Sequence, residues 1–508
     1  MRTICGTILA AGSLVLAASA MAADASAGDA ALTERIRKDH PRMFFNADMW
    51  LRMKENAKGP ARASLDALLK RVDSYPENPV CADFGPVQFH EVKTAGGTHK
   101  TTAASPIVNV KEWGSQAAEC AHGAFDIRDY GAKGDGETKD TAAIQRAIDA
   151  ASAAGGGEVL LPKGIYLCGS VFLKNGVDFH IAEGAVLKGS PDKEDYNALD
   201  VAPQNWGRLG SGDNISGGHL ILCVEQENVT LRGPGKVDGN VGAFLKMPDG
   251  SHPPTKLRIP WRPAQMIWFV ESRNVTIRDI EIADAPYWSC FIYGCEDVVV
   301  ERANIHTVRN PHTYNGDGLD IDSSRRVRVT DCNISTADDA ITLRAAGQGH
   351  LKNDGPCADI TVSNCTFSSD CNAIRLGVGN GVIRDCSFTG IRIENTRYAV
   401  NAVGAWSRPE HGVDISNISF RDMQIDAKGF CKFYYKHATD SVFDGIAFRQ
   451  VRGRVREPSI FDDTPKRPFR NLVFEDVKLE GETSPRVAGK RDAERQPREA
   501  AVSGRALK

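Results

Sequence analysis

The sequence predicts an all-β protein that folds as a right-handed parallel β-helix, a solenoid of stacked coils, and three observations carry this prediction. Short strand-like segments recur along the chain, and the middle ones begin 23, 29, 33 and 22 residues apart. A period of this size is typical of stacked coils whose insertions fall in loops. Two clusters of aspartates, at 315–320 and 338–339, also lie about one coil apart. Finally, about 486 residues after a leader would be long for one compact domain, whereas a solenoid can grow because each repeat packs only on its neighbours.

Residues 1–22 have the pattern of a secretory signal peptide. Arg2 supplies the positive charge, residues 4–18 form the apolar stretch, and the small residues Ala20 and Ala22 offer a cleavage site. No later window holds the ~18 consecutive apolar residues of a membrane span. We therefore expect a periplasmic or extracellular protein that does not reside in a membrane. An uncleaved N-terminal anchor is the alternative.

Residues 23–120 are expected to form a short helical segment followed by a linker. Between 32 and 75 apolar residues recur at three- and four-residue spacing, as in Leu65 and Leu69, which predicts a helix. Residues 76–120 are rich in Pro, Gly and Thr, which indicates a linker or an irregular cover packed along the solenoid.

The predicted β-helix occupies residues 121–482, and a helix belongs to its first part. Asp140 is the expected N-cap of a helix over 141–148, whose apolar residues fall on one face. Such a helix can cover the open end of the solenoid, where an unpaired coil edge would invite association. With the glycine-rich run that follows, this stretch resembles the N-terminal cap and first coils of the pectate-lyase-like β-helix superfamily. Residues 483–508 carry mixed charges without apolar periodicity and are expected to be a disordered tail.

Eight short segments after the cap have the β-branched and apolar composition of strands. They are residues 228–231, 274–277, 297–300, 326–329, 359–362, 381–384, 414–417 and 471–474. Cys332, Cys365 and Cys386 lie about six residues into their repeats, and we expect reduced thiols that fill the core as small hydrophobes. Disulfides are the alternative in an oxidising compartment. A metal site would need His partners, and none has suitable spacing.

The overall charge excludes one large class of partner. The chain has 62 basic and 65 acidic side chains, and no basic stretch is interleaved with aromatic residues. This pattern argues against a nucleic-acid groove. Any binding of a polyanion would have to depend on a local group of cations.

The two aspartate clusters are the strongest indication of chemistry. Asp317 precedes the pair Asp338 and Asp339 by 21 and 22 residues, and coils stack at roughly 4.8 Å, so the three carboxylates are predicted to share one exposed face. Glycoside hydrolysis requires such groups: an acid that protonates the leaving oxygen, and a carboxylate that activates water or attacks the sugar. The alternative is that these are turn residues, since Asp and Gly are common at bends. Adjacent acids repel each other, however, and turns alone would gain little from crowding them.

The motifs around these acids, together with the segment 285–288, resemble glycoside hydrolase family 28, the polygalacturonases and their relatives. The resemblance spans roughly residues 125–450. It implies that Asp338 is the general acid and that Asp317 and Asp339 hold the attacking water in a single, inverting displacement. Crowded carboxylates suit this division of roles, because their repulsion raises at least one proton affinity while another group stays a base.

The sequence departs from the family pattern at three places. Asn372 occupies the place of the family's histidine, and an amide cannot titrate near neutral pH. The family's Arg-Ile-Lys segment has no clean match, because 390–394 carries an acid in place of the lysine and 398–401 is a competing alignment. Gly316 replaces a threonine, which we expect to affect mainly loop flexibility. The altered cations argue for a different sugar or a different way of holding it.

Six residues are expected to bind the substrate. Arg344 and Arg375 follow the active-site motifs at positions that could project from the same face as the aspartates and replace the missing cations. Each could instead be paired with a neighbouring Asp, a contact worth little if it is exposed. Tyr435 could form a sugar-stacking wall or belong to the core. The other three belong to the motifs themselves and are Asn315, Asp320 and Asn372.

We therefore expect a secreted glycoside hydrolase that cleaves a pectin-like or other acidic polysaccharide by an inverting acid/base mechanism. It should act as a monomer, with no cofactor, metal, nucleic acid or membrane. One alternative is a polysaccharide lyase on the same fold, in which the aspartates bind Ca²⁺ and Arg344 removes a proton. The other is a non-catalytic carbohydrate-binding β-helix with a retired active site.

Overall fold

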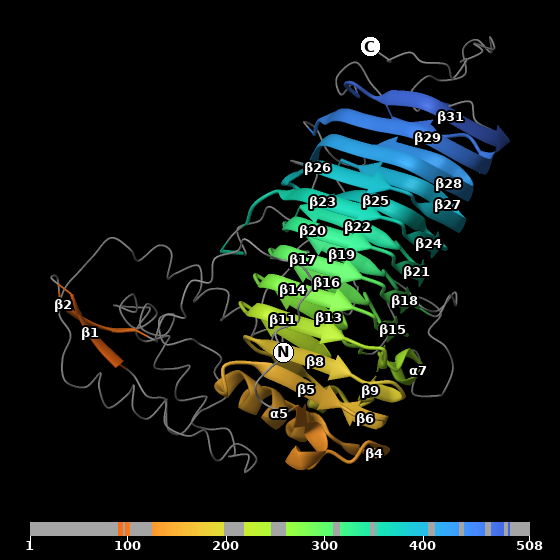
Figure 1. Cartoon of the computed structure of the whole chain (residues 1–508). Helices are drawn as coiled ribbons and strands as arrows, with labels where there is room; N and C mark the ends of the chain where they lie inside the picture. The colour runs from red at the N-terminus through yellow and green to blue at the C-terminus, as the bar shows by residue number, and fades with distance from the viewer. Residues whose placement is uncertain are drawn as a thin grey trace, which may run out of the picture. The chain divides into compact units, whose positions relative to one another are not determined.

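From β3 (Phe125–Asp126) onward the strands stack into a right-handed parallel β-helix, as the sequence predicts (Figure 1). In this computed structural model each described coil of the unit Ala117–Lys508 pairs in parallel with the next coil. The residues that the structure describes are 90–94, 97–101, 124–197, 218–244, 261–307, 315–345, 351–352, 354–404, 412–435, 441–462, 469–481 and 486–487.

The other unit, Met1–Gln116, is described only at an antiparallel hairpin formed by β1 (His90–Thr94) and β2 (Gly97–Thr101). The prediction of a linker or irregular cover over 76–120 missed these two strands. They contain almost no apolar residues, so they lack the alternation of apolar and polar positions that marks a half-buried strand. The expected signal peptide and N-terminal helix lie outside the described residues.

Three rows of strands run along the described solenoid. The first row contains β7 (Val171–Leu173), β10 (Ile221–Val224), β13 (Ile267–Val270), β16 (Cys290–Tyr293), β19 (Leu319–Asp322), β22 (Ile341–Ala345) and β25 (Asn372–Gly379). The second row continues from β3 through β5 (Gly157–Leu161), β8 (Val177–Ile181), β11 (Glu227–Arg232), β14 (Arg273–Arg278), β17 (Glu296–Glu301), β20 (Arg325–Thr330), β23 (Cys357–Ser363) and β26 (Val382–Thr389). The third row contains β4 (Asp135–Lys139), β6 (Gly164–Cys168), β9 (Ala185–Gly189), β12 (Lys236–Asp238), β15 (Glu281–Ala283), β18 (Asn304–His306), β21 (Asn333–Thr336) and β24 (Thr366–Ser369).

Toward the C-terminal end the strands lengthen and continue around the corners between rows. These strands are β27 (Arg392–Val403), β28 (Asp414–Tyr434), β29 (Phe443–Glu457), β30 (Ile460–Phe461), β31 (Val473–Gly481) and β32 (Arg486–Val487). Strand β32 pairs with β30, so residues 486–487 correct the prediction that the whole of 483–508 is disordered. Among the described residues, no helix combines the length and the apolar character needed to cross a membrane.

The repeat that the sequence shows originates at a corner near the start of second-row strands. Asn228, Asn274, Asp297 and Asp359, which open four of the predicted repeats, all have φ between 53° and 59°. This left-handed conformation is costly for most residues and is tolerated best by Asn and Asp, which explains their recurrence there. The corner asparagines also stack, because Asn274 Nδ2 donates to Asn228 Oδ1 at 2.6 Å.

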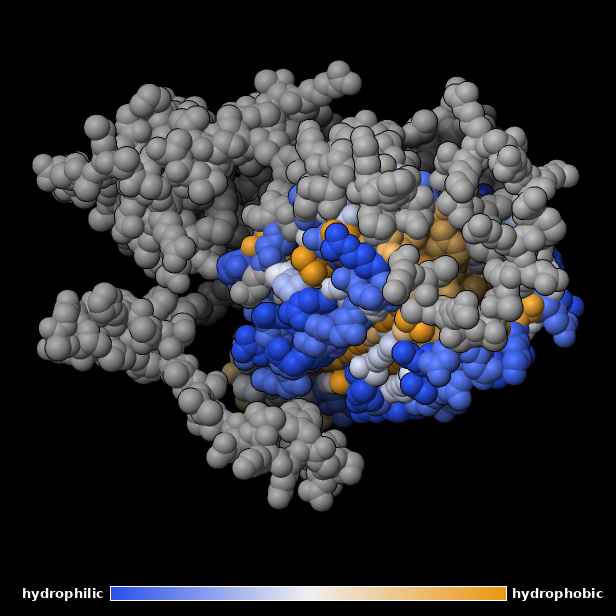
Figure 2. Space-filling model, turned by 90° about the horizontal axis from the view of Figure 1, so that it is seen from above, coloured by the Kyte–Doolittle hydropathy of each residue, from blue (hydrophilic) through white to orange (hydrophobic). Residues whose placement is uncertain are grey.

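The interior of the solenoid is filled by the inward-facing residue of each strand. Val229 and Leu231 of β11 are fully buried, and equivalent aliphatic residues lie one coil apart along the second row. Near the C-terminal end aromatic rings take over: those of Phe420 and Phe448 stack 4.6 Å apart at 6°. Burying apolar surface in this way, at about 25 cal/mol per Å², is the main term that holds the coils together. Figure 2, seen from above the view of Figure 1, shows mostly hydrophilic residues on the described outer surface, with hydrophobic ones between them.

All ten described cysteines are free and none forms a disulfide, as expected for Cys332, Cys365 and Cys386. Cys332 and Cys365 lie on successive coils just before β21 and β24. Cys386 does not continue this pair: it faces Ile360 of β23, in another line of the core. Cys386 differs because the left-handed corner of its coil is Asp385, with φ 57°. The predicted repeat began at Gly381 instead, which placed Cys386 too far along its coil.

The predicted capping helix is α5 (Thr141–Ala153), and it covers the first coils with its buried face, which includes Ile144 and Ile148. Asp140 precedes the helix as expected, but its side chain does not cap it. The carboxylate instead accepts hydrogen bonds from the backbone N–H groups of Lys133 (2.7 Å) and Gly134 (3.0 Å). Asp140 therefore ties the preceding loop to the helix. The remaining short helical elements are η2 (Ile127–Tyr130), η3 (Lys193–Asp195) and α7 (Val241–Phe244).

Candidate active site

Three consecutive turns of the solenoid bring the aspartate motifs together. Asp317 lies in the turn before β19, Asp338 and Asp339 lie in the turn before β22, and Cys371 lies in the turn before β25. The backbone N–H of Gly318 donates to the carbonyl of Asp339 at 2.9 Å and holds the first two turns in register. The spacing of 21 to 22 residues is therefore one coil, as the sequence predicts.

The three acids line a single pocket on the first row of strands. Asp317 and Asp339 are 6% and 2% exposed, whereas Asp338 is half-buried. Two guanidinium groups share the pocket with the three carboxyl groups, so opposite charges meet in a small space. Its lining consists of Asp317, Asp338, Asp339, Thr342, Arg344, Arg375 and Val378.

Asp339 is the carboxylate most firmly fixed by its neighbours. Arg375 Nη1 donates to its Oδ2 at 2.8 Å, and Asn372 Nδ2 donates to its Oδ1. Burial on its own would lower the pKa of Arg375, but the Asp339 charge outweighs this and the pKa is raised, so the guanidinium stays charged. Both oxygens of Asp339 accept hydrogen bonds, as those of an ionised carboxylate do. The contact with Arg375 is charge-assisted and correspondingly strong.

A second amide sets the orientation of Asn372. Asn401 Nδ2, one coil further along, donates to Asn372 Oδ1 at 2.9 Å, which leaves the Nδ2 of Asn372 facing Asp339. Asn372, where the resemblance places a histidine, therefore contacts a catalytic candidate. It donates to Asp339 and does not take part in proton transfer, because an amide does not titrate.

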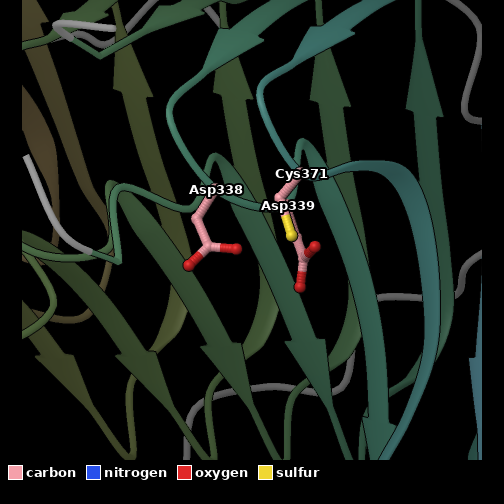
Figure 3. A group of neighbouring side chains, drawn as sticks. All are labelled: Asp338, Asp339 and Cys371. Carbon is pink, nitrogen blue, oxygen red and sulfur yellow. The ribbon is translucent and has the colours of Figure 1, made fainter. Parts of the chain in front are cut away.

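Asp338 is held through its backbone. Its carbonyl accepts hydrogen bonds from Thr336 Oγ1 (2.6 Å) and Ser369 Oγ, and its own N–H donates to the carbonyl of Gly316 at 3.2 Å. Figure 3 shows the side chains of Asp338 and Asp339 leaving the same turn, with the Cys371 thiol beside Asp339. The turn is thus fixed from both neighbouring coils while the half-buried carboxyl group of Asp338 faces the pocket.

The thiol of Cys371 is an unexpected neighbour of the acid pair. Its Sγ and one oxygen of each of Asp338 and Asp339 lie within 4.8 Å of one another. Burial raises the pKa of this thiol, and the two carboxylates raise it further, so Cys371 is a neutral thiol at physiological pH. The three groups make a poor site for Ca²⁺, which takes six to eight oxygen ligands. Arg375 also already supplies a positive charge to Asp339.

Arg344, which lines the pocket, forms a buried ion pair with Asp320, which does not. Arg344 Nε donates to Asp322 at 3.2 Å, its Nη1 lies 3.7 Å from Asp320, and its guanidinium lies 4.5 Å from the ring centroid of Trp288. Asp320 is fully buried, which corrects its expected role in binding substrate: it supports Arg344 instead. Arg344 does line the pocket, but its guanidinium is also paired with Asp320 and Asp322. Pairing with a neighbouring Asp is the alternative that the sequence left open.

The turn that carries Asp317 is shaped by Asn315 and Gly316. Asn315 has a left-handed φ of 58° and is 8% exposed, so it lies in the wall of the turn. A side chain on Gly316 would approach Thr307 Oγ1 to 3.1 Å and Ala337 Cβ to 3.4 Å. The glycine therefore permits close packing of adjacent turns, which corrects the expectation that it mainly adds flexibility.

Tyr435 is not in the pocket. It is 5% exposed, and its ring lies 4.8 Å from that of Phe443 and 5.6 Å from that of Phe469, within the core. Its expected role as a sugar-binding wall is thus corrected to a core role. The neighbouring Tyr434 and Lys432 are the outward-facing residues of this strand end.

Sequence reasoning did not single out Arg397, Lys432 or Tyr434. The signal that could have found Lys432 was the alternation around the buried Phe433, which places residues 432 and 434 on the outer face. Arg375, Asn401 and Lys432 are register partners on successive coils, so Lys432 continues the line of side chains that leaves the pocket.

Residues 211–489 match the sequence profile of glycosyl hydrolases family 28, and residues 124–215 match that of the rhamnogalacturonase A/epimerase, pectate lyase-like group. The chain is similar to an exo-poly-alpha-D-galacturonosidase from Dickeya chrysanthemi, with 26% identity over 59% of this chain and 54% of the relative. It is also similar to a probable polygalacturonase from Arabidopsis thaliana, with 26% identity over 58% of this chain and 66% of the relative. The aligned part thus spans between half and two thirds of these two relatives.

Two solved structures share the fold. An exopolygalacturonase from Thermotoga maritima superimposes with a TM-score of 0.56 at 19% identity, covering 71% of this chain and 88% of that one. A polygalacturonase from Erwinia carotovora superimposes with a TM-score of 0.54 at 18% identity, covering 70% of this chain and 94% of that one. At these identities the likeness establishes the architecture of the solenoid.

Proposed function

The chain belongs to glycosyl hydrolases family 28, and from this premise we propose that it hydrolyses glycosidic bonds in a pectin-like polysaccharide by an inverting acid/base mechanism. The observation that carries the proposal is the single pocket shared by Asp317, Asp338 and Asp339, in which Asp339 is paired with Arg375. Inverting hydrolysis needs an acid on one side of the scissile bond and a water-activating carboxylate on the other.

The contacts of the two adjacent acids suggest how they divide the work. Arg375 and Asn372 stabilise negative charge on Asp339, so a proton shared by the pair resides on its neighbour Asp338. Asp338 is then the general acid that protonates the leaving oxygen. Asp339 and Asp317 orient a water molecule and accept its proton as it attacks the anomeric carbon. The Cys371 thiol stays neutral and adds no third charge to the pair.

A galacturonate-containing polymer is the substrate class that fits best. The names of the Dickeya and Arabidopsis relatives describe enzymes that act on galacturonan, and the pocket of this chain contains Arg344 and Arg375, each of which also contacts an aspartate of the protein. An acidic sugar carries a carboxylate, which a guanidinium binds with charge-assisted hydrogen bonds.

A panel of defined galacturonan, rhamnogalacturonan and alginate oligosaccharides tests the reaction. We expect new reducing ends without ultraviolet absorbance from an unsaturated sugar, and NMR of the first product should show the inverted anomer. Chelator should leave the rate unchanged, because the carboxylates, thiol and guanidinium suit Ca²⁺ poorly. Unsaturated products that disappear with chelator would identify the lyase alternative, and tight binding without products would identify the non-catalytic one.

Asn372→Ala should lower kcat by up to about a hundredfold with little change in KM, because Asp339 loses the donor that fixes one of its oxygens. The unsatisfied oxygen should also cost about 1–3 kcal/mol of stability. Steady-state kinetics and thermal melting measure the two effects. The matched control is Asn333→Ala, which removes an exposed amide that donates to Asn304 at 3.1 Å and should change neither. A wild-type kcat in the first variant would remove Asn372 from the positioning network.

We further propose that the protein is exported and acts as a monomer in the periplasm or outside the cell. The support for export is the pattern of residues 1–22, with its charged start, apolar stretch and small-residue cleavage site. N-terminal sequencing of the protein recovered from cell fractions, with light scattering of the same material, checks both statements; a retained leader or a stable oligomer would contradict them.

A further inference from the structure

Three potential metal ligands meet at the acid pair. The Sγ of Cys371 and one oxygen each of Asp338 and Asp339 lie within 4.8 Å of one another, and Figure 3 shows that they come from two adjacent turns. No other three His, Cys, Asp or Glu side chains of the described residues meet in this way. The proposed hydrolysis uses the two carboxyl groups but needs no sulfur.

The donor set of two oxygens and one sulfur selects the class of ion. Ca²⁺ and Mg²⁺ prefer oxygen ligands and take about six or more of them. Zn²⁺ takes four ligands, accepts both thiolate and carboxylate, and is often held by three protein groups with water in the fourth position. The neutral thiol of Cys371 does not prevent this, because a binding metal ion displaces the thiol proton.

The cluster can close around such an ion with a small movement. Ligand atoms of a tetrahedral zinc site lie roughly 3.5 Å apart, so the groups here must approach by no more than about 1.3 Å. Asp338 can supply this movement, because its carboxyl group is half-buried and its turn is held through the backbone. Cys371 is fixed in place, since its N–H donates to Ser369 Oγ at 2.9 Å.

Asp339 keeps the capacity to bind an ion although it is already hydrogen-bonded. Arg375 and Asn372 each donate to a different oxygen, whereas an ionised carboxylate has about four lone-pair sites. The charges also favour a cation, because the pocket holds three carboxyl groups and two guanidinium groups, and Arg344 is already paired with two other aspartates. Net negative charge therefore remains beside the cluster.

A buried hydroxyl group gives independent evidence for a polar ligand in this pocket. Thr342 lines the pocket, is 1% exposed, and its Oγ1 has no hydrogen-bond partner among the described residues. Buried hydroxyl groups normally have a partner. A water molecule bound at the fourth position of the ion would supply one.

We propose that Asp338, Asp339 and Cys371 form an inhibitory site for a thiophilic divalent cation such as Zn²⁺. On binding, a metal–sulfur bond replaces the S–H bond of Cys371, and the proton goes to solvent. The ion also displaces the proton of Asp338 and occupies Asp339, so neither carboxyl group can act on the substrate. No electrons are transferred. The inhibition rests on the proposed function, whereas the binding of the ion does not.

Titration with Cd²⁺, a thiophilic stand-in for Zn²⁺, tests the site directly, because cadmium bound to a thiolate gives an ultraviolet charge-transfer band. The protein carries Cys5→Ala, Cys81→Ala and Cys120→Ala throughout, so that only the described cysteines remain. We expect a band that saturates at one Cd²⁺ per chain and disappears in Cys371→Ala. Isothermal titration should show that Zn²⁺ binds at least about tenfold more weakly to that variant.

The same ion should inhibit hydrolysis. Relative to its own uninhibited rate, Cys371→Ala should need at least about tenfold more Zn²⁺ for half inhibition. Mg²⁺ at the same concentrations should not inhibit either protein, because it prefers a full set of oxygen ligands. The matched control is Cys386→Ala, which removes a buried core thiol and should leave the cadmium band and the inhibition unchanged.

Each outcome separates the site from the reaction. Equal bands and equal Zn²⁺ affinities with and without the Cys371 thiol would mean an adventitious ion only and would overturn the site. If the ion binds as expected but the rate does not fall, the inhibitory role is wrong while the hydrolysis stands. If no oligosaccharide is cleaved, the proposed function fails, but the cadmium band and the titration still decide the ion site.

Discussion

Asp338→Asn should lower kcat on the best substrate by about a thousandfold or more and leave the melting temperature unchanged. The amide has the same shape as the acid but cannot give a proton to the leaving oxygen, and general acid catalysis contributes about 10²–10⁴ to the rate. The fold should survive, because the contacts that fix this turn go to the backbone of Asp338, from Thr336 and Ser369. Steady-state kinetics on the oligosaccharide and thermal melting measure the two effects.

The leaving group separates the role of a proton donor from a general loss of geometry. A substrate with an acidic aryl leaving group needs little protonation, so Asp338→Asn should recover much of its rate on it, whereas Asp339→Asn and Asp317→Asn should not. Asp359→Asn is the matched control. Asp359 is an exposed corner residue with φ 58°, which Asn adopts readily, so this variant should match wild type. Equal loss on both leaving groups would take the role of acid away from Asp338.

The distribution of these carboxylates could be predicted from the sequence because parallel coils convert spacing into distance. Asp320 is the register partner of Thr342, so residues one coil apart in sequence become direct neighbours. The same rule predicted that Asp317 would lie beside the pair at 338–339. The corners make the coil spacing visible in the sequence, since Asn and Asp recur there because they tolerate a left-handed φ.

Details that depend on the direction of a single side chain could not be predicted in the same way. Tyr434 and Tyr435 are adjacent at the end of β28, and which of them faces inward follows by alternation only once Phe433 is known to be buried, so sequence alone did not show that Tyr435 is the core residue. Cys386 was displaced for a related reason, because its strand begins before the corner at Asp385. Asp320 was expected to bind the substrate, but whether an acid meets substrate or Arg344 depends on three-dimensional packing.

Arg375→Met should destabilise the protein by about 3–5 kcal/mol, because it leaves the Asp339 carboxylate buried without its cation. Chemical denaturation at neutral pH measures this loss as a shift of the midpoint at constant slope. Arg326→Met is the comparison: Arg326 pairs with Asp297 and Glu296 on the preceding coil, but Arg326 and Asp297 are nearly half exposed and Glu296 keeps Arg325 as a partner, so the cost should be under about 1 kcal/mol. Equal costs at the two sites would show that the pocket is wetter than its burial indicates.

The double variant Arg375→Met with Asp339→Asn distinguishes an unpaired charge from lost packing. If the single variant is unstable because a carboxylate is left alone, removing that charge should recover a large part of the stability, giving a coupling energy well above the few tenths of a kcal/mol that independent sites show. Activity should stay low in the double variant, because Asp339 no longer accepts a proton from water. Recovered stability with low activity would mean that Arg375 acts on the reaction through Asp339. Its role would be to stabilise the negative charge of Asp339 in a buried position. If the two stability losses simply add, Arg375 contributes only packing. Another group must then stabilise the ionised form of Asp339.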